Sequence, residues 1–181
     1  MNVLRIIFFI IFAYIPFAVF PEKYPIYSIK TSIAIVDKEA LFKKSEWGIS
    51  VLNEVERRVK LLADENRNIE KKLMQEELKL TKNRKKIDKL EFDVLSFEFD
   101  KKVKLVREVQ SNKQTDINIF LNERRNFFSN KITPILLNFI NELGVEVLLN
   151  KDTVALAYTG SDITNAAIIM INSQLINDSY K

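Results

Sequence analysis

The sequence predicts an α+β fold in which a long α-helical hairpin, a coiled-coil arm, projects from a small β body formed by both chain ends. Three observations support this prediction. β-rich segments occur near the two ends of the chain, the middle carries an apolar stripe at helical spacing, and neither Gly nor Pro occurs between Gly48 and Pro134. Because strands at the two ends have to pair, the helical middle must fold back on itself.

Residues 1–20 indicate an export signal. Arg5 is followed by 15 apolar residues from Ile6 to Phe20, whereas a helix that spans a membrane needs roughly 20. A short apolar run after a cation is typical of a signal peptide. The run ends in Phe20 instead of a small residue, so an uncleaved membrane anchor remains the alternative. Residues 21–31 are predicted to form a polar, proline-containing linker.

Three segments are predicted to supply the strands of the body. Residues 32–37 (SIAIVD) are rich in β-branched side chains and end at Asp37, a residue type that favours helix N-caps. Residues 145–150 (VEVLLN) and 153–158 (TVALAY) are separated by a Lys-Asp dipeptide and predict a tight β-hairpin. A final helix, from Ile163 to about Leu175, should close the body.

Residues 49–143 are predicted to form the arm, and residues 32–48 and 144–181 the body. An apolar stripe with alternating three- and four-residue steps begins at Leu52 and continues over about four heptads. The stripe lapses within residues 81–89, where the polar residues are densest. We therefore expect the turn of the hairpin there.

Two segments carry a resemblance to a known family. The first is IAIVDKEALFKKSEWG, in which Asp37, Phe42, Ser45 and Gly48 follow one another just before the long helix. The second is ITPILLNFINELGVEVLLNKDTVALAYTGSDIT, a helix that ends in Gly, a Val/Leu strand and a closing Asp-Ile-Thr. Over about residues 32–176 the chain resembles the Skp/OmpH-like periplasmic chaperones.

The resemblance implies a homotrimer in which the sheets of three subunits join and three helical hairpins surround a cavity. It implies an ATP-independent holdase of the periplasm that binds unfolded outer-membrane proteins and prevents their aggregation. The sequence contains no Gly-rich phosphate-binding loop. This is consistent with a chaperone that does not use ATP. The expected partners are therefore unfolded outer-membrane proteins and further copies of the chain itself.

Apolar residues of the arm are the candidates for contact with such a client protein. Leu, Met and Phe side chains placed among charges offer many weak, adaptable contacts. The alternative is that these side chains pack one arm helix on the other. The candidates are Leu73, Met74, Leu78, Leu90, Phe92, Phe97 and Phe99.

The turn of the arm is expected to be basic. From Lys79 to Lys89 six cations accompany one anion, Asp88, which gives a local net charge of 6 − 1 = +5. Clustered cations attract anionic surfaces, so we expect this tip to contact anionic lipid or acidic client segments. A charge run is also typical of a solvated surface with no partner. The candidates are Lys82, Arg84, Lys85, Lys86 and Lys89.

The composition argues against several other functions. The chain contains no Cys and no His, which excludes thiolate nucleophiles, imidazole bases and Cys/His metal sites. We predict no enzyme activity, no metal and no cofactor. Nucleic acid is not an expected partner, because acidic residues are interleaved with the basic ones. A membrane-anchored coiled-coil adaptor or structural protein of the cell envelope remains the alternative. Trp47 is expected to pack the body against the arm, and Asp152 and Asp162 to lie in turns.

Overall fold

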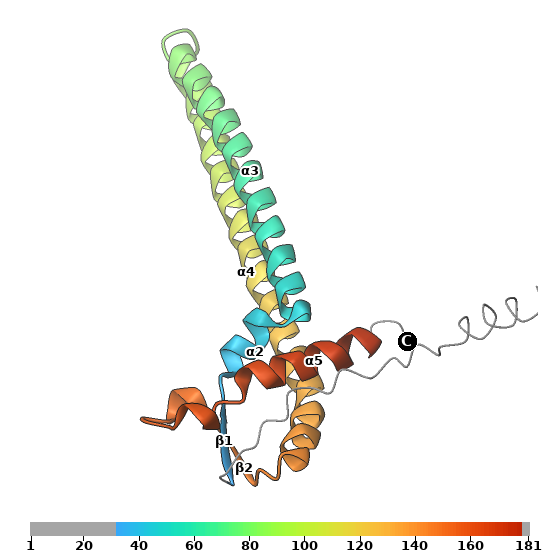
Figure 1. Cartoon of the computed structure of the whole chain (residues 1–181). Helices are drawn as coiled ribbons and strands as arrows, with labels where there is room; N and C mark the ends of the chain where they lie inside the picture. Colours follow the sequence, from blue (N-terminus) through green and yellow to red (C-terminus); the bar gives the residue numbers. More distant parts are fainter. Residues whose placement is uncertain (1–31, 179–181) are drawn as a thin grey trace, which may run out of the picture.

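The computed structural model describes residues 32–178, so the predicted export signal and linker lie outside the described residues. Figure 1 shows two long helices that lie side by side and project together from a small body. The predicted α+β fold with a helical arm is confirmed. The elements are β1 (Ile33–Val36), α2 (Lys38–Lys44), α3 (Glu46–Asn83), α4 (Lys89–Glu142), β2 (Val147–Asn150), the 3-10 turns η2 (Lys151–Thr153) and η3 (Thr159–Ser161), and α5 (Thr164–Asp178).

β1 and β2 form a two-stranded parallel sheet that joins both ends of the chain, as predicted. Ile33 is paired with Val147 and Val36 with Asn150. β1 is buried from Ala34 to Val36, whereas β2 alternates between exposed and half-buried positions. β1 is therefore the inner strand, and β2 forms an edge.

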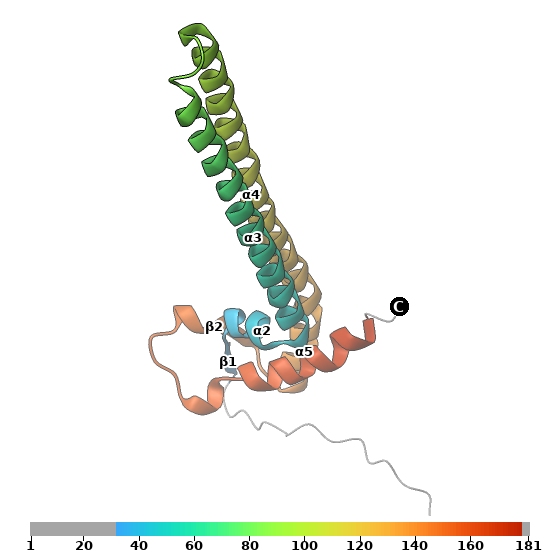
Figure 2. The ribbon, with the colours of Figure 1, turned by 90° about the horizontal axis from the view of Figure 1, so that it is seen from above.

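The predicted β-hairpin is wrong, because residues 153–158 do not form a strand. The chain instead turns through η2, and the segment up to η3 projects from the body (Figures 1 and 2). The Lys-Asp dipeptide lacks the Gly or Asn that a two-residue hairpin loop needs at positive φ. Thr153 Oγ1 instead donates a hydrogen bond to the carbonyl of Asn150 at 2.7 Å. The chain returns to the sheet at Asp162, which forms a parallel bridge with Ile35.

A single residue, Ser45, separates α2 from α3. Asp37 caps α2, since its Oδ1 accepts a hydrogen bond from the backbone N–H of Ala40 at 2.8 Å. Ser45 caps α3 by accepting from the N–H of Gly48 at 3.1 Å, and its hydroxyl donates to the carbonyl of Phe42 at 3.1 Å. These side-chain bonds satisfy backbone groups that helix ends leave free. The two caps fix the direction in which the arm leaves the body.

The body core lies between α2, α5, β1 and the adjacent part of α4, and α5 crosses the base of the arm (Figure 2). Leu41 and Ile171 are fully buried within it. At the arm base the Trp47 ring stacks on Phe127 and Phe128, with centroids 5.8 and 5.5 Å apart. Trp47 therefore packs the body against the arm, as predicted.

The arm is packed at its base and open further out. Residues 84–88 join α3 to α4. Leu62 on α3 and Ile117 on α4 are the outermost buried residues of the arm. From residue 63 to residue 116 no side chain is buried. The outer arm, defined here as residues 63–116, thus leaves its apolar stripe partly or fully exposed in the single chain.

Gly48 is predicted to be essential for the junction between α2 and α3. A Cβ at this position would lie 1.7 Å from the carbonyl oxygen of Phe42, which belongs to the backbone and cannot move alone. We expect Gly48→Ala to lower the free energy of unfolding by about 3 kcal/mol. Urea denaturation at fixed protein concentration measures the loss.

Gly160→Ala is the matched control for this prediction. A Cβ there would meet only the side chain of Tyr158, at 2.7 Å, and this side chain is exposed and free to move. The change should remain within about 0.5 kcal/mol. Equal losses in both variants would contradict the role of Gly48.

Candidate functional site

The seven apolar candidates lie on both helices of the outer arm. Leu90 and Phe97 are 73% and 71% exposed, and Met74 and Leu78 are also exposed. Leu73, Phe92 and Phe99 are half-buried. Between residues 73 and 99 the outer arm therefore presents large apolar side chains among charged ones.

A cleft of about 630 Å³ lies between α3 and α4 in the middle of the outer arm. It brings together three of the candidates, Leu73, Met74 and Phe99, whereas the other four do not line it. Ile69, Val103 and Val106 complete its apolar lining and were not among the candidates. Helical spacing could have found them, because each lies three or four residues from another lining residue.

Two salt bridges connect the arm helices on either side of this cleft. Glu76 pairs with Lys102 and Glu65 with Lys113, each with a nitrogen to oxygen distance of 2.5 Å. The hydrogen bonds from Lys113 and Gln110 lower the pKa of Glu65. All four paired side chains are about half exposed, so the bridges set the register of the helices more than they stabilise the arm.

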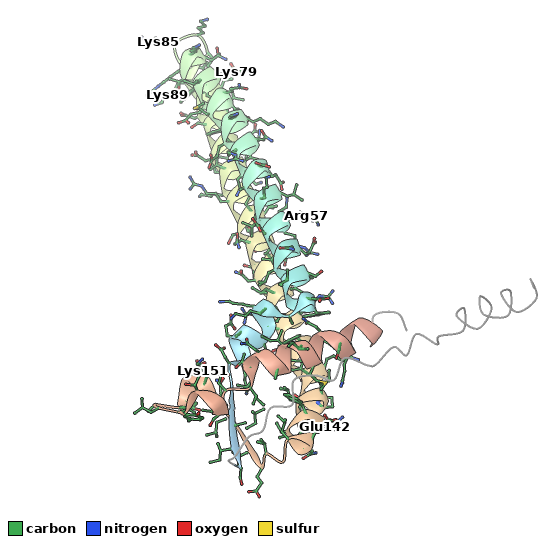
Figure 3. The ribbon with its side chains drawn as sticks, viewed as in Figure 1. Arg57, Lys79, Lys85, Lys89, Glu142 and Lys151 are labelled. Atoms are coloured by element: carbon green, nitrogen blue, oxygen red, sulfur yellow. The ribbon has the colours of Figure 1, made fainter. Side chains whose placement is uncertain are left out.

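The five basic candidates gather at the far end of the arm. Figure 3 shows Lys79, Lys85 and Lys89 there, remote from the body. All five candidates are exposed, and within residues 32–178 none of them forms a salt bridge. Lys89 begins α4, where a cation opposes the helix dipole. The tip is therefore a cluster of cations without an ion pair among the described residues, and Asp88 is the one anion between Lys79 and Lys89.

An ion pair ties the body to the arm base. Arg125 on α4 donates two hydrogen bonds to Glu39 on α2, at 2.6 and 2.9 Å. Its guanidinium also lies over the Phe42 ring, 4.7 Å from the centroid. The hydrogen bond from Arg125 lowers the pKa of Glu39 to about 2, with a smaller contribution from Lys43 and against the effect of burial. No local sequence signal predicted this contact between residues 86 positions apart.

Asp152 and Asp162 lie in turns, as predicted. Asp162 accepts hydrogen bonds from the backbone N–H of Thr164 at 3.0 Å, from its hydroxyl, and from Lys151 at 2.9 Å. Burial raises the pKa of Asp162, but these hydrogen bonds outweigh burial and lower it overall. Thr164 Oγ1 accepts from the N–H of Asp37 at 2.9 Å. These hydrogen bonds connect the start of α5, through Asp162 and Thr164, to Asp37 at the end of β1.

The segment between β2 and α5 exposes apolar side chains that the sequence placed in a strand. Leu156 is 95% exposed and Tyr158 is 83% exposed. Val147 and Leu149 on the edge strand β2 are exposed as well. The body thus has an apolar surface of its own. The only sequence signal for this surface was the β-branched and aromatic composition of the segment, which had predicted a strand.

The described elements define a protein in which a two-stranded body carries one long helical hairpin. A solved structure from Caulobacter crescentus CB15, described as a candidate outer membrane chaperone (OmpH-like), has this fold. The two chains agree with a TM-score of 0.74 over 86% of this chain and 91% of that chain, at 14% sequence identity. No family model matches the sequence, and no curated protein matches it. The likeness shows that the chain has an OmpH-like fold.

Within residues 32–178, no helix combines the length and the apolar character needed to cross a membrane. Within the same range, no three Asp or Glu side chains lie together in a way that could hold a metal ion.

Acid is predicted to weaken the ion pair between Glu39 and Arg125. The folded pKa of Glu39, about 2, lies below the ordinary value of 4.5, so the pair stabilises the fold at neutral pH. Its contribution is lost as the pH falls from about 4.5 toward 2. Because both side chains are about a third exposed or more, we expect the contribution to be about 0.5–1 kcal/mol.

Urea midpoints of the wild type and of Glu39→Gln at about pH 7 and about pH 3 test this prediction. The wild type should lose more stability on acidification than the variant, because other carboxylates titrate equally in both. Equal losses would show that the pair between Glu39 and Arg125 does not contribute.

Proposed function

We propose that this protein is an ATP-independent holdase chaperone of the periplasm, which binds unfolded outer-membrane proteins between the arms of a homotrimer. The observation that carries the proposal is the outer arm, where apolar side chains follow both helices and none is buried. The OmpH-like fold supports the same class of protein. Exposed apolar surface of this extent marks an interaction site on a folded protein.

The chemistry of the outer arm suits a client without a fixed shape. Unfolded chains differ in sequence, so a protein that holds many of them needs numerous weak contacts instead of one specific pocket. Met74 is flexible and polarisable, and Phe97 and Leu90 project from the opposite helix. Charged residues between them keep the empty arm in solution.

Self-association is supported by the body. A two-stranded sheet is marginally stable alone, and a free strand edge favours pairing with another chain. β2 supplies such an edge with Val147 and Leu149 exposed, and the exposed Leu156 and Tyr158 follow in the segment after it. Three copies joined through this surface would place three arms around one cavity. The cavity would keep bound clients apart from one another.

The cations of the tip are proposed to contact anionic lipid or acidic client segments. Near a membrane, each cation contributes about 1 kcal/mol of attraction to an anionic surface. The five candidates lie at the end of the arm that is farthest from the body, so the arm can present them while the body holds the cavity. Such contact would keep the chaperone close to the membrane where its clients emerge.

A client assay tests the holdase proposal. When an unfolded outer-membrane β-barrel protein is diluted from urea, light scattering should be suppressed at a near-stoichiometric ratio of trimer to client. The variant with Met74, Leu78, Leu90 and Phe97 changed to Ser should suppress much less, because these exposed side chains provide client contacts. Circular dichroism checks that its helices are intact.

The control changes four exposed apolar residues near the body to Ser, namely Ile49, Leu61, Ile119 and Leu137. This control should retain its activity. Equal loss in both variants, or no suppression by the wild type, would contradict the proposal. Sedimentation equilibrium of the same preparations should give the mass of three chains. A monomer or dimer would favour the adaptor alternative.

Liposome co-sedimentation tests the tip. Vesicles of phosphatidylglycerol and phosphatidylcholine should bind the wild type at low salt, and reversal of Lys82, Arg84, Lys85 and Lys86 to Glu should abolish binding. Reversal of Lys60, Lys71, Lys72 and Lys104, which are exposed along the arm, makes the same change in net charge. Binding that survives the tip reversal, or that both reversals abolish equally, would refute a role for the tip.

A further inference from the structure

Salt bridges connect the two helices near both ends of the cleft in the middle of the arm. Its lining runs from Asn66 to Glu77 on α3 and from Phe99 to Gln110 on α4. The salt bridge between Glu65 and Lys113 lies just beyond its end toward the body, and the one between Glu76 and Lys102 lies beside its last turn toward the tip. The two bridges hold the helices in register on either side. Its volume of about 630 Å³ is within the range of known ligand sites, roughly 300–1,000 Å³.

The charge of the cleft is opposite to that of the protein. Three carboxylates, Glu70, Glu77 and Asp100, line it together with one cation, Arg107, which gives 1 − 3 = −2. The whole chain carries +4. Among the described residues, none of these four side chains forms a salt bridge. An apolar lining with free carboxylates complements an occupant that is both apolar and cationic.

A buried acceptor in the same cleft lacks a donor. Gln110 lines the cleft, and its Oε1 is buried without a hydrogen-bond partner in the part of the chain that the structure describes. The amide nitrogen of Gln110 donates to Glu65 Oε1 at 3.4 Å, which fixes the direction of the amide. A buried acceptor without a donor costs free energy. Rotation of the Gln110 side chain toward the cleft would let a backbone N–H or an ammonium group of an occupant satisfy it.

We propose that this cleft binds a polypeptide segment whose apolar side chains are flanked by Lys or Arg. The inference rests on the proposed chaperone function and gives the arm a preferred class of client segment. The apolar side chains would lie on Leu73, Met74 and Phe99, and the flanking cations would meet the carboxylates. The tip then selects anionic surfaces, and the middle of the same arm selects cationic segments.

Binding of two labelled peptides to the full protein tests the proposal. Both peptides share a short leucine core, which is flanked by Lys in one and by Glu in the other, and fluorescence anisotropy at low ionic strength measures their affinities. We expect the Lys-flanked peptide to bind about five- to tenfold more tightly, since each exposed charge pair contributes a modest amount. The net charge of the protein alone would produce the opposite preference. Equal affinities, or a preference for the Glu-flanked peptide, would overturn the proposal.

Two triple variants test whether the preference for the Lys-flanked peptide arises in the cleft. Glu70→Gln, Glu77→Gln and Asp100→Asn together should abolish it, because they remove the carboxylates of the cleft. Glu56→Gln, Asp93→Asn and Glu98→Gln change the net charge equally at exposed positions outside the cleft and should retain it. A preference that persists in the first variant, or disappears in the second, would place the site elsewhere and overturn the proposal.

The client assay separates this proposal from the holdase function. If the wild type suppresses aggregation but shows no preference between the peptides, the cleft proposal fails and the holdase function stands. If the peptide preference follows the cleft carboxylates but aggregation is not suppressed, the cleft is a peptide site and the holdase function fails.

Discussion

The parallel pairing of β1 with β2 joins Ile33 to Val147, residues 147 − 33 = 114 positions apart. Parallel strands require a crossover connection, and here that connection contains α2 and the whole arm. The sheet therefore brings the start of α3 and the end of α4 to the same body. Asp162 adds a second tie, because it returns the chain to β1 and bonds the start of α5. Without this closure the two long helices would have no common base.

Features with a local signal could be predicted from the sequence. Asp37 ends a β-rich run and caps a helix, and a long interval without Gly or Pro produced two long helices. The absence of a strand at residues 153–158 could not be predicted, because β-propensity describes a side chain that suits a half-buried pleated surface and does not identify a partner strand. The contacts of Glu39 with Arg125 and of Glu65 with Lys113 depend on the register between elements far apart in sequence. Helical spacing could have found the apolar members of the cleft that were missed, but its carboxylates could not be distinguished from other exposed charges.

The arm combines two kinds of packing. At its base the stacked rings of Trp47 and Phe128 and the pair between Glu39 and Arg125 hold α3 and α4 against the body. Further out, half-buried apolar contacts and exposed salt bridges connect the helices, and such bridges contribute little to stability. Local stability should therefore decrease from the body toward the tip. The exposed apolar side chains of the outer arm therefore lie where the two helices are least tightly packed.

The length of α3 turns its anchoring into a mechanical property. With 38 residues and a rise of about 1.5 Å per residue, the helix extends about 57 Å from Ser45, and a tilt of about 5° at the base would displace its end by about 5 Å. The arm thus pivots about its contacts with the body. Shifts of about one ångström among Glu39, Trp47 and Arg125 would therefore move the tip cations by several ångströms.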